Sequence, residues 1–178
     1  MNIRTIKDFN ELQKEEPTVL VLGYFDGIHL GHKALFERAR KVADERGLTV
    51  TVLTFPESPR LAFSRFTPEL LLHLTSQQQR YLLLEKNGVD QLVMTPFTSE
   101  FASNTPEEFI ERYVKGLNAQ ALVAGFDYHF GNCRADVKDL TELVDGRVEI
   151  VREVSLGGEK VSSTRIRRAL QSGDVSLA

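Results

Sequence analysis

Two histidines follow a glycine-rich turn near the start of the chain, in the segment Gly23-Tyr24-Phe25-Asp26-Gly27-Ile28-His29-Leu30-Gly31-His32. Glycines let backbone N–H groups approach a ligand closely, and a helix start offers free N–H donors to an anion. Histidines add donors that a positive charge strengthens. Fixed donors aimed at the α-phosphate oxygens of a nucleotide would stabilise the charge that develops there. The segment therefore predicts phosphoryl or nucleotidyl transfer.

Other interpretations of this segment stay open. The two histidines could be no more than polar residues that cap a helix. A metal-binding site is a second interpretation with less support, because the segment has neither a Glu at the zincin spacing nor a cysteine pair. A Walker P-loop is excluded, since no Gly-Lys-Ser/Thr follows. Gly31 removes a side chain between the histidines, so a phosphate could lie against the backbone there.

A second candidate anion site lies near the end of the chain, in Lys160-Val161-Ser162-Ser163-Thr164-Arg165-Ile166-Arg167. Serine and threonine at a helix start, followed by arginine, can bind an anion. Alone, such a run usually only caps a helix. Paired with the histidine segment, it predicts two cationic helix starts that hold one triphosphate from both ends.

Two further segments could contact a planar ligand. Residues 125–131 contain Asp127, a possible acceptor for a ring N–H or hydroxyl, among aromatic residues that could stack. The loop at residues 55–63 is rich in proline and could close over a ligand. The alternatives are a strand end with core aromatic residues and a plain connection. His129 and Cys133 are too few for a metal site, and we expect His73 to be an ordinary core or surface histidine.

Apolar runs alternate with helical patterns, which is typical of a parallel sheet covered by helices on both faces. We expect an α/β fold with a Rossmann-like sheet of about five strands, whose carboxyl ends carry the site. The expected strands are residues 18–25, 48–55, 89–94, 147–154 and one beginning with 121–124. The expected helices are 30–46 ended by Gly47, 76–87, 105–115 and 163–171. We expect a loop at 56–67 and a tight turn at 157–158.

Composition narrows the class of protein. The 178 residues suit one domain, and a net charge of −3 gives no basic footprint for nucleic acid. One cysteine excludes an intrachain disulfide and fits a reducing compartment. No run approaches the roughly 20 apolar residues that span a bilayer, and the first residues lack an apolar signal core. We expect a soluble, cytoplasmic protein that binds neither nucleic acid nor membrane.

The chain resembles the FAD synthetase family, and within it the adenylyltransferase module of bacterial bifunctional riboflavin kinase/FMN adenylyltransferases. The His-x-Gly-His pattern alone indicates only the wider nucleotidyltransferase superfamily. Several segments that occur together and in order carry the narrower resemblance, which extends over nearly the whole chain: residues 23–32, 96–102, 106–115, 125–131 and 160–167.

The resemblance implies a nucleotidyltransferase that makes FAD and pyrophosphate from ATP and FMN with Mg²⁺. It makes His29, His32 and Arg167 catalytic residues. The nucleotide contacts that it implies are Gly23, Phe25, Asp26, Gly27, Gly31, Ser163, Thr164 and Arg167. The flavin contacts that it implies are Pro59, Phe63, Asp127 and Tyr128. Mg²⁺ would be bound mainly by the ATP phosphates, since it keeps several waters.

The chain departs from the family pattern in two ways. Ser58-Pro59 stands where the family often has His-Pro, and residues 1–178 are expected to lack the kinase β-barrel of the bifunctional members. We expect residues 1–178 to be one adenylyltransferase domain without riboflavin kinase activity, either independent or trimmed from a bifunctional protein. Two alternative functions stay open. One is a nucleotidyltransferase with another phosphate acceptor, and the other is a flavin- or nucleotide-binding regulator with little catalysis.

Overall fold

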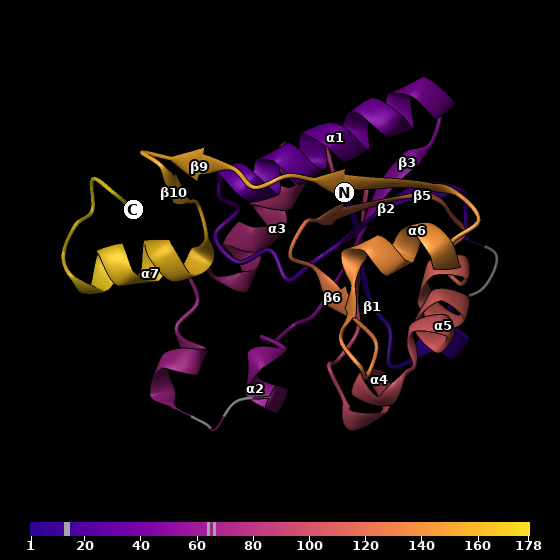
Figure 1. Cartoon of the computed structure of the whole chain (residues 1–178), viewed down its shortest axis with the longest axis horizontal. Helices are drawn as coiled ribbons and strands as arrows, with labels where there is room; N and C mark the ends of the chain where they lie inside the picture. Colours follow the sequence, from indigo (N-terminus) through magenta and orange to yellow (C-terminus); the bar gives the residue numbers. More distant parts are fainter. Residues whose placement is uncertain (13–14, 64, 66) are drawn as a thin grey trace.

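A six-stranded parallel sheet forms the centre of the molecule, in the order β1-β4-β3-β2-β5-β8 (Figure 1). The computed structural model describes residues 1–12, 15–63, 65 and 67–178, without the side chains of Phe63 and Glu69. The strands are β1 (Asn2–Thr5), β2 (Thr18–Leu22), β3 (Thr49–Thr54), β4 (Gln91–Met94), β5 (Ala119–Gly125) and β8 (Arg147–Val151). The expected parallel α/β sheet is confirmed.

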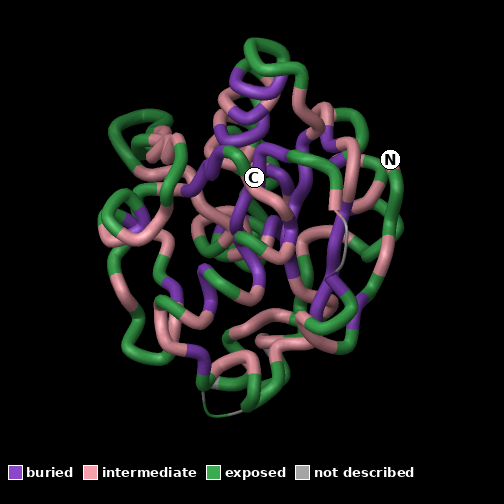
Figure 2. Tube along the Cα trace, turned by 90° about the vertical axis from the view of Figure 1, so that its right-hand side faces the viewer, coloured by how far each residue is buried: buried purple, intermediate pink, exposed green. Residues whose placement is uncertain are grey.

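Alternate residues of β2 pack into two different cores. Val19 and Val21 face a core that contains α1 (Leu30–Arg46) and α3 (Gln77–Lys86), while Leu20 and Leu22 face the opposite side. That second core contains α5 (Pro106–Phe109), η3 (Ile110–Lys115) and α6 (Leu140–Leu143). A strand buried on both faces must be apolar throughout. Figure 2 shows these buried segments running through the middle of the molecule, with exposed segments around them.

The remaining elements are short or lie outside the main sheet. Two hairpins, β6–β7 and β9–β10, stand apart from it. The bounds are η1 (Phe9–Glu11), α2 (Arg60–Phe63), η2 (Pro68–Leu71), α4 (Ser99–Ser103), β6 (His129–Phe130), β7 (Ala135–Asp136), η4 (Val137–Asp139), β9 (Ser155–Leu156), β10 (Glu159–Lys160) and α7 (Ser163–Gln171). The expected turn at residues 157–158 joins β9 to β10.

Local signals set the helix ends as expected. Helix α1 ends at Gly47 in the left-handed conformation, at φ 65°. Ser76 and Gln79 form a capping box at α3, and Thr105 and Glu108 form one at α5. Helix α5 continues as a π-helix, η3, through the expected end at residue 115. Within the described part of the chain, no helix is long and apolar enough to span a membrane.

Two expectations were wrong. Strand β1 was not predicted, because this edge strand is short and mostly exposed and so carries no buried alternating pattern. The expected loop at 56–67 contains a helical turn, α2, which begins after Pro59. Proline ends the preceding strand, but its fixed φ also suits the start of a helical turn.

The strand order reverses direction beside β2. Strand β3 pairs with one side of β2 and β5 pairs with the other, so the loops that follow β2 and β5 diverge. In open parallel sheets, ligands bind in the crevice at such a reversal, beyond the carboxyl ends of the strands. Residues 23–32 and 125–131 therefore lie on the two sides of such a crevice.

Leu20 tests the two-sided burial of β2. The side chain is 0% exposed, so Leu20→Ala should lower the free energy of unfolding by about 2–5 kcal/mol. Leu82→Ala on α3 is the matched control, because Leu82 is 65% exposed and should lose less than about 1 kcal/mol. Urea unfolding measures both variants. Equal losses would contradict the assignment of Leu20 to a packed core.

Candidate active site

The loop between β2 and α1 is folded back tightly on itself. Phe25, Gly27 and Ile28 adopt positive φ angles of 59°, 86° and 37°. A Cβ atom at Gly23 would lie 2.6 Å from Cζ of Phe25, so glycine leaves the space that this ring occupies. The Phe25 ring is buried and packs against His32 and Phe36. The loop therefore fixes the start of α1 at the carboxyl end of β2.

Asp26 connects this loop to two distant segments. It is 3% exposed, and its carboxylate accepts hydrogen bonds from the backbone N–H groups of Leu74, at 2.9 Å, and Thr75, at 3.3 Å. The carboxylate also forms an ion pair with Arg167 of α7. The Asp26 carbonyl accepts a hydrogen bond of 2.7 Å from Oγ of Ser163. These contacts hold the start of α7 beside the start of α1.

The two histidines stack at the start of α1. Their ring centroids are 3.7 Å apart, with an interplanar angle of 18°. His29 is the N-cap, and its Nδ1 accepts a 3.3 Å hydrogen bond from the backbone N–H of His32. The proton of neutral His29 therefore lies on Nε2, which is a donor. A Cβ at Gly31 would lie 3.2 Å from the His29 ring, so this glycine makes room for the ring. That a phosphate could also lie against this backbone stays a prediction, since Gly31 lines the cavity described below.

Burial keeps both histidines neutral. It is the main cause of the lowered pKa of His29, and the nearby Lys160 ammonium lowers it further. Burial lowers the pKa of His32 to about 3, with a smaller contribution from His29. Nδ1 of His32 is buried and has no hydrogen-bond partner among the described residues. An anion that accepted a hydrogen bond from either ring would favour the charged form and raise the pKa again.

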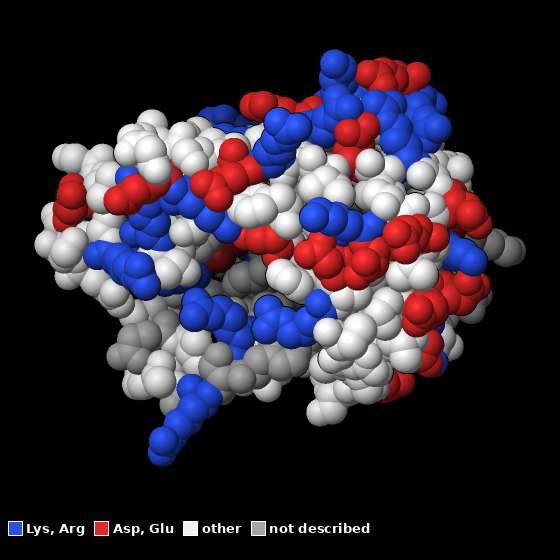
Figure 3. Space-filling model, in the orientation of Figure 1, with Lys and Arg blue, Asp and Glu red and all other residues white. Residues whose placement is uncertain are grey.

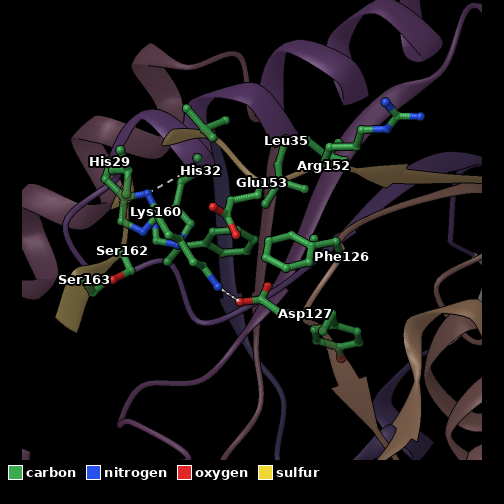
Figure 4. A pocket seen from close by; sticks show the side chains of 18 of the residues that line it. His29, His32, Leu35, Phe126, Asp127, Arg152, Glu153, Lys160, Ser162 and Ser163 are labelled. Carbon is green, nitrogen blue, oxygen red and sulfur yellow. Dashed lines mark hydrogen bonds and ion pairs between the residues drawn. The ribbon is translucent and has the colours of Figure 1, made fainter. Parts of the chain in front are cut away.

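Lys160 points across the site from β10. Its ammonium forms an ion pair with Asp127, as Figure 4 shows. The ammonium also lies 4.5 Å from the ring centroid of Phe126. Just beyond it, Ser162 caps α7 by accepting a 3.2 Å hydrogen bond from the backbone N–H of Arg165. Lys160 lies in the segment 160–167 predicted to bind an anion, but no role was predicted for it. A basic residue two positions before a helix cap was the available signal.

A cavity of about 310 Å³ lies between the two helix starts. On the face in Figure 3, the surface is hollowed beside α7, with Lys and Arg side chains around the hollow. The cavity brings together these expected site residues: Gly23, Phe25, His29, Gly31, His32, Asp127, Tyr128 and Ser163. Four expected nucleotide contacts are not among its lining residues: Asp26, Gly27, Thr164 and Arg167. Gly27 packs against Leu74, Thr164 lines a separate hollow, and the other two form the ion pair described above.

A second cavity, of about 470 Å³, adjoins the first and is largely aromatic. Pro59, Asp127 and Tyr128 line it as expected, whereas the Phe63 side chain lies outside the described part of the chain. Phe55 and Phe130 also line it, from the two segments that we expected to contact a planar ligand, whereas Phe97, Phe101 and Phe109 were not predicted as ligand contacts. The two cavities share four lining residues, Gly23, Tyr24, Asp127 and Tyr128. A ligand that occupied both would cross this boundary.

The lowered pKa of His32 predicts a pH-dependent stability. Between the ordinary value of 6.5 and the folded value of about 3, the unfolded chain binds a proton that the folded chain does not. Stability is therefore full above pH 6.5 and falls as the pH drops, by about 1 kcal/mol per pH unit for one proton. His32→Gln should flatten this fall in urea unfolding between pH 7 and pH 5. Parallel pH curves for the two proteins would contradict the burial of a neutral His32.

The sequence profile of the FAD synthetase family matches residues 11–165. The chain is 38% identical over 174 residues to a bifunctional riboflavin kinase/FMN adenylyltransferase of Bacillus subtilis, covering 95% of this chain and 55% of that protein. It is 33% identical over 159 residues to an FAD synthetase of Listeria monocytogenes, covering 87% of this chain and 64% of that protein. The chain thus spans about half the length of the bifunctional relatives that it matches.

Solved structures give the same fold. A crystal structure described as a macrolide-efflux protein from Streptococcus pneumoniae superposes with a TM-score of 0.93 at 42% identity, over 98% of this chain and 58% of that one. Pantothenate synthetase from Thermus thermophilus shares the fold at a TM-score of 0.53 and 19% identity, over 96% of this chain and 76% of that one. The family profile and the sequence relatives together show that the chain belongs to the FAD synthetase family.

Proposed function

We propose that this chain is an FMN adenylyltransferase, which transfers AMP from ATP to FMN and releases pyrophosphate. One observation carries the proposal. A cavity at the starts of α1 and α7, lined by His29, His32, Lys160 and Ser163 among others, meets an aromatic cavity at a boundary of four shared residues. The first suits a nucleoside triphosphate and the second suits a flat aromatic acceptor. Their boundary lies where a phosphate of each substrate could meet.

In the proposed reaction, an oxygen of the FMN phosphate attacks the α-phosphorus of ATP. A new P–O bond forms while the bond to the β-phosphate oxygen breaks, and pyrophosphate leaves with that electron pair. The attacking phosphate is itself the nucleophile, so positioning and electrostatics carry the catalysis. We assign His29 and His32 to the α-phosphate, where N–H donors stabilise the charge of the transition state.

The start of α7 would hold the leaving pyrophosphate. Ser163 lines the nucleotide cavity, and its hydroxyl oxygen can still accept or relay a hydrogen bond while it donates to Asp26. Arg167 has five N–H donors, of which Asp26 and the Leu72 carbonyl use only some. Thr164 is exposed at the same helix start. We propose that Thr164 and Arg167 bind the terminal phosphates from outside the cavity, and that Gly27 and Asp26 act by shaping the loop.

The aromatic cavity would hold the flavin ring. Asp127 offers a carboxylate that can accept the ring N–H, and Lys160 lies beside it to balance the charge. Pro59 and Tyr128 line the cavity, and we keep Phe63 as a proposed flavin contact. Ser58 provides no ring where the family often has histidine. The loop at residues 55–63 would therefore contact the flavin through aromatic packing more than through polar groups.

Mg²⁺ fits this arrangement as a partner of the nucleotide. Among the described residues, no three His, Cys, Asp or Glu side chains gather to hold a metal, and the Asp26 carboxylate already has several donors. We propose that ATP phosphates and water supply most of its ligands. When bound, the ion would neutralise charge on the phosphates. We further propose a cytoplasmic protein whose residues 1–178 form one adenylyltransferase domain without riboflavin kinase activity.

Product identity tests the proposed function. The protein should form FAD when incubated with ATP, Mg²⁺ and FMN, and should form no dinucleotide with phosphopantetheine or nicotinamide mononucleotide. Chromatography with pyrophosphate detection measures each reaction. Another dinucleotide in place of FAD would favour a related transferase. Tight flavin or nucleotide binding without pyrophosphate release would favour a regulator, and either result would contradict the proposal.

The role of His32 predicts a specific kinetic loss. His32→Ala should lower kcat by roughly 10²–10³-fold, the typical effect of removing one transition-state donor. Steady-state FAD synthesis measures the loss, and circular dichroism confirms folding. Lys33→Ala is the matched control, because Lys33 is the next residue on α1 and is exposed. A kcat of His32→Ala near that of Lys33→Ala would contradict the proposed catalytic role of His32.

A further inference from the structure

Tyr24 lies between three cavities. It lines both substrate cavities and a third, of about 370 Å³, formed by the residues around His73 and Arg80. Its carbonyl accepts a 3.0 Å hydrogen bond from Oγ1 of Thr54, at the end of β3. Burial raises the pKa of the Tyr24 hydroxyl, which lies 3.1 Å from Nδ1 of His73. The orientation of this one ring therefore shapes the boundary between the proposed nucleotide and flavin sites.

Arg80 holds Tyr24 from the far side. It projects from α3, is only 4% exposed and lies outside the linings of both substrate cavities. The central carbon of its guanidinium lies 5.3 Å from the centroid of the Tyr24 ring, which is a cation–π contact. A charge buried this deeply needs fixed partners to offset its lost hydration. Tyr24 is one of them.

The second partner of Arg80 is the loop at residues 55–63, which follows β3. A terminal N–H of Arg80 donates a 2.9 Å hydrogen bond to the carbonyl of Phe55, the residue that follows β3. The Phe55 ring packs edge-on against Phe97, at 5.0 Å, and Phe101, at 5.1 Å, and all three line the aromatic cavity. Arg80 thus holds the backbone of one flavin-cavity wall and the ring of the wall that both cavities share.

We propose that Arg80 is a positioning residue for the acceptor half of the site, acting through Tyr24 and Phe55 without touching substrate. This inference rests on the proposed function. A planar guanidinium can face a ring and donate to a carbonyl at the same time, which a lysine ammonium cannot do with the same geometry. Nε of Arg80 is buried and has no hydrogen-bond partner among the described residues, so these two contacts account for much of its interaction with the protein.

Arg80→Lys tests the proposal by separating the two substrates. We expect the KM for FMN to rise about tenfold, the usual scale for loss of a buried charged hydrogen bond, while the KM for ATP changes less than about twofold. Quenching of flavin fluorescence should show the same loss of FMN affinity without turnover. Arg40→Lys is the matched control. Arg40 also donates to backbone carbonyls, those of Gly88 and Leu48, but lies on α1 away from both cavities.

Tyr24 variants keep the test decisive if Arg80→Lys fails to fold. Tyr24→Phe keeps the ring beneath the guanidinium, so its affinity for FMN should stay within about threefold of that of the wild type. Tyr24→Leu removes the ring and should lower the affinity for FMN about tenfold. In the Arg80→Lys/Tyr24→Leu double variant, the fold-loss of FMN affinity should be smaller than the product of the two single fold-losses, because the two residues act through one contact.

Two results would overturn the role of Arg80. One is an equal rise in KM for both substrates, which indicates a general structural role. The other is FMN affinity unchanged from Arg40→Lys. Failure of the proposed function has a different signature, because the wild-type protein itself would then form no FAD, whereas a failed role for Arg80 leaves wild-type synthesis intact.

Discussion

The buried carboxylate of Asp26 is the contact on which the rest of the site depends. In the proposed function, two helix starts separated by most of the chain lie side by side to bind one triphosphate. Asp26 joins them, because its carboxylate pairs with Arg167 and its carbonyl accepts from Ser163. The backbone N–H groups of Leu74 and Thr75 hold the same carboxylate from a third direction. Removing it would leave a partly buried guanidinium without its carboxylate partner, which is far costlier than losing a surface ion pair.

The sheet explains why the two cavities adjoin. Strand β2 lies between β3 and β5, so the loops after β2, β3 and β5 all open at one edge. The loop after β2 carries the histidines, the loop after β3 carries Phe55 and Pro59, and the turn after β5 carries Asp127. The cavity with the histidines and the aromatic cavity thus lie side by side at the ends of three neighbouring strands. In the proposed reaction, this places the attacking phosphate and the α-phosphorus at the shared boundary.

Local patterns made much of the fold and part of the site predictable. Caps, prolines and glycines act within a few residues, so α1, α3, α5 and α7 could be bounded from the sequence. Contacts between residues far apart in the sequence could not be predicted in this way. Nothing near Asp26 indicates that its carboxylate faces Arg167, and the aromatic lining combines Phe55, Phe97 and Phe130 from separate segments. Strand β1 could not be predicted from the sequence, because an exposed edge strand needs no apolar pattern.

A crystal structure of the protein with bound FAD would test the central claim most directly. We predict that the adenosine half occupies the cavity beside His29 and Ser163, and that the isoalloxazine ring lies among Phe55, Phe97 and Phe101. The diphosphate should cross the boundary formed by Gly23, Tyr24, Asp127 and Tyr128, within hydrogen-bond distance of the His29 ring. FAD with its flavin outside the aromatic cavity, or with its diphosphate away from the histidines, would contradict the account.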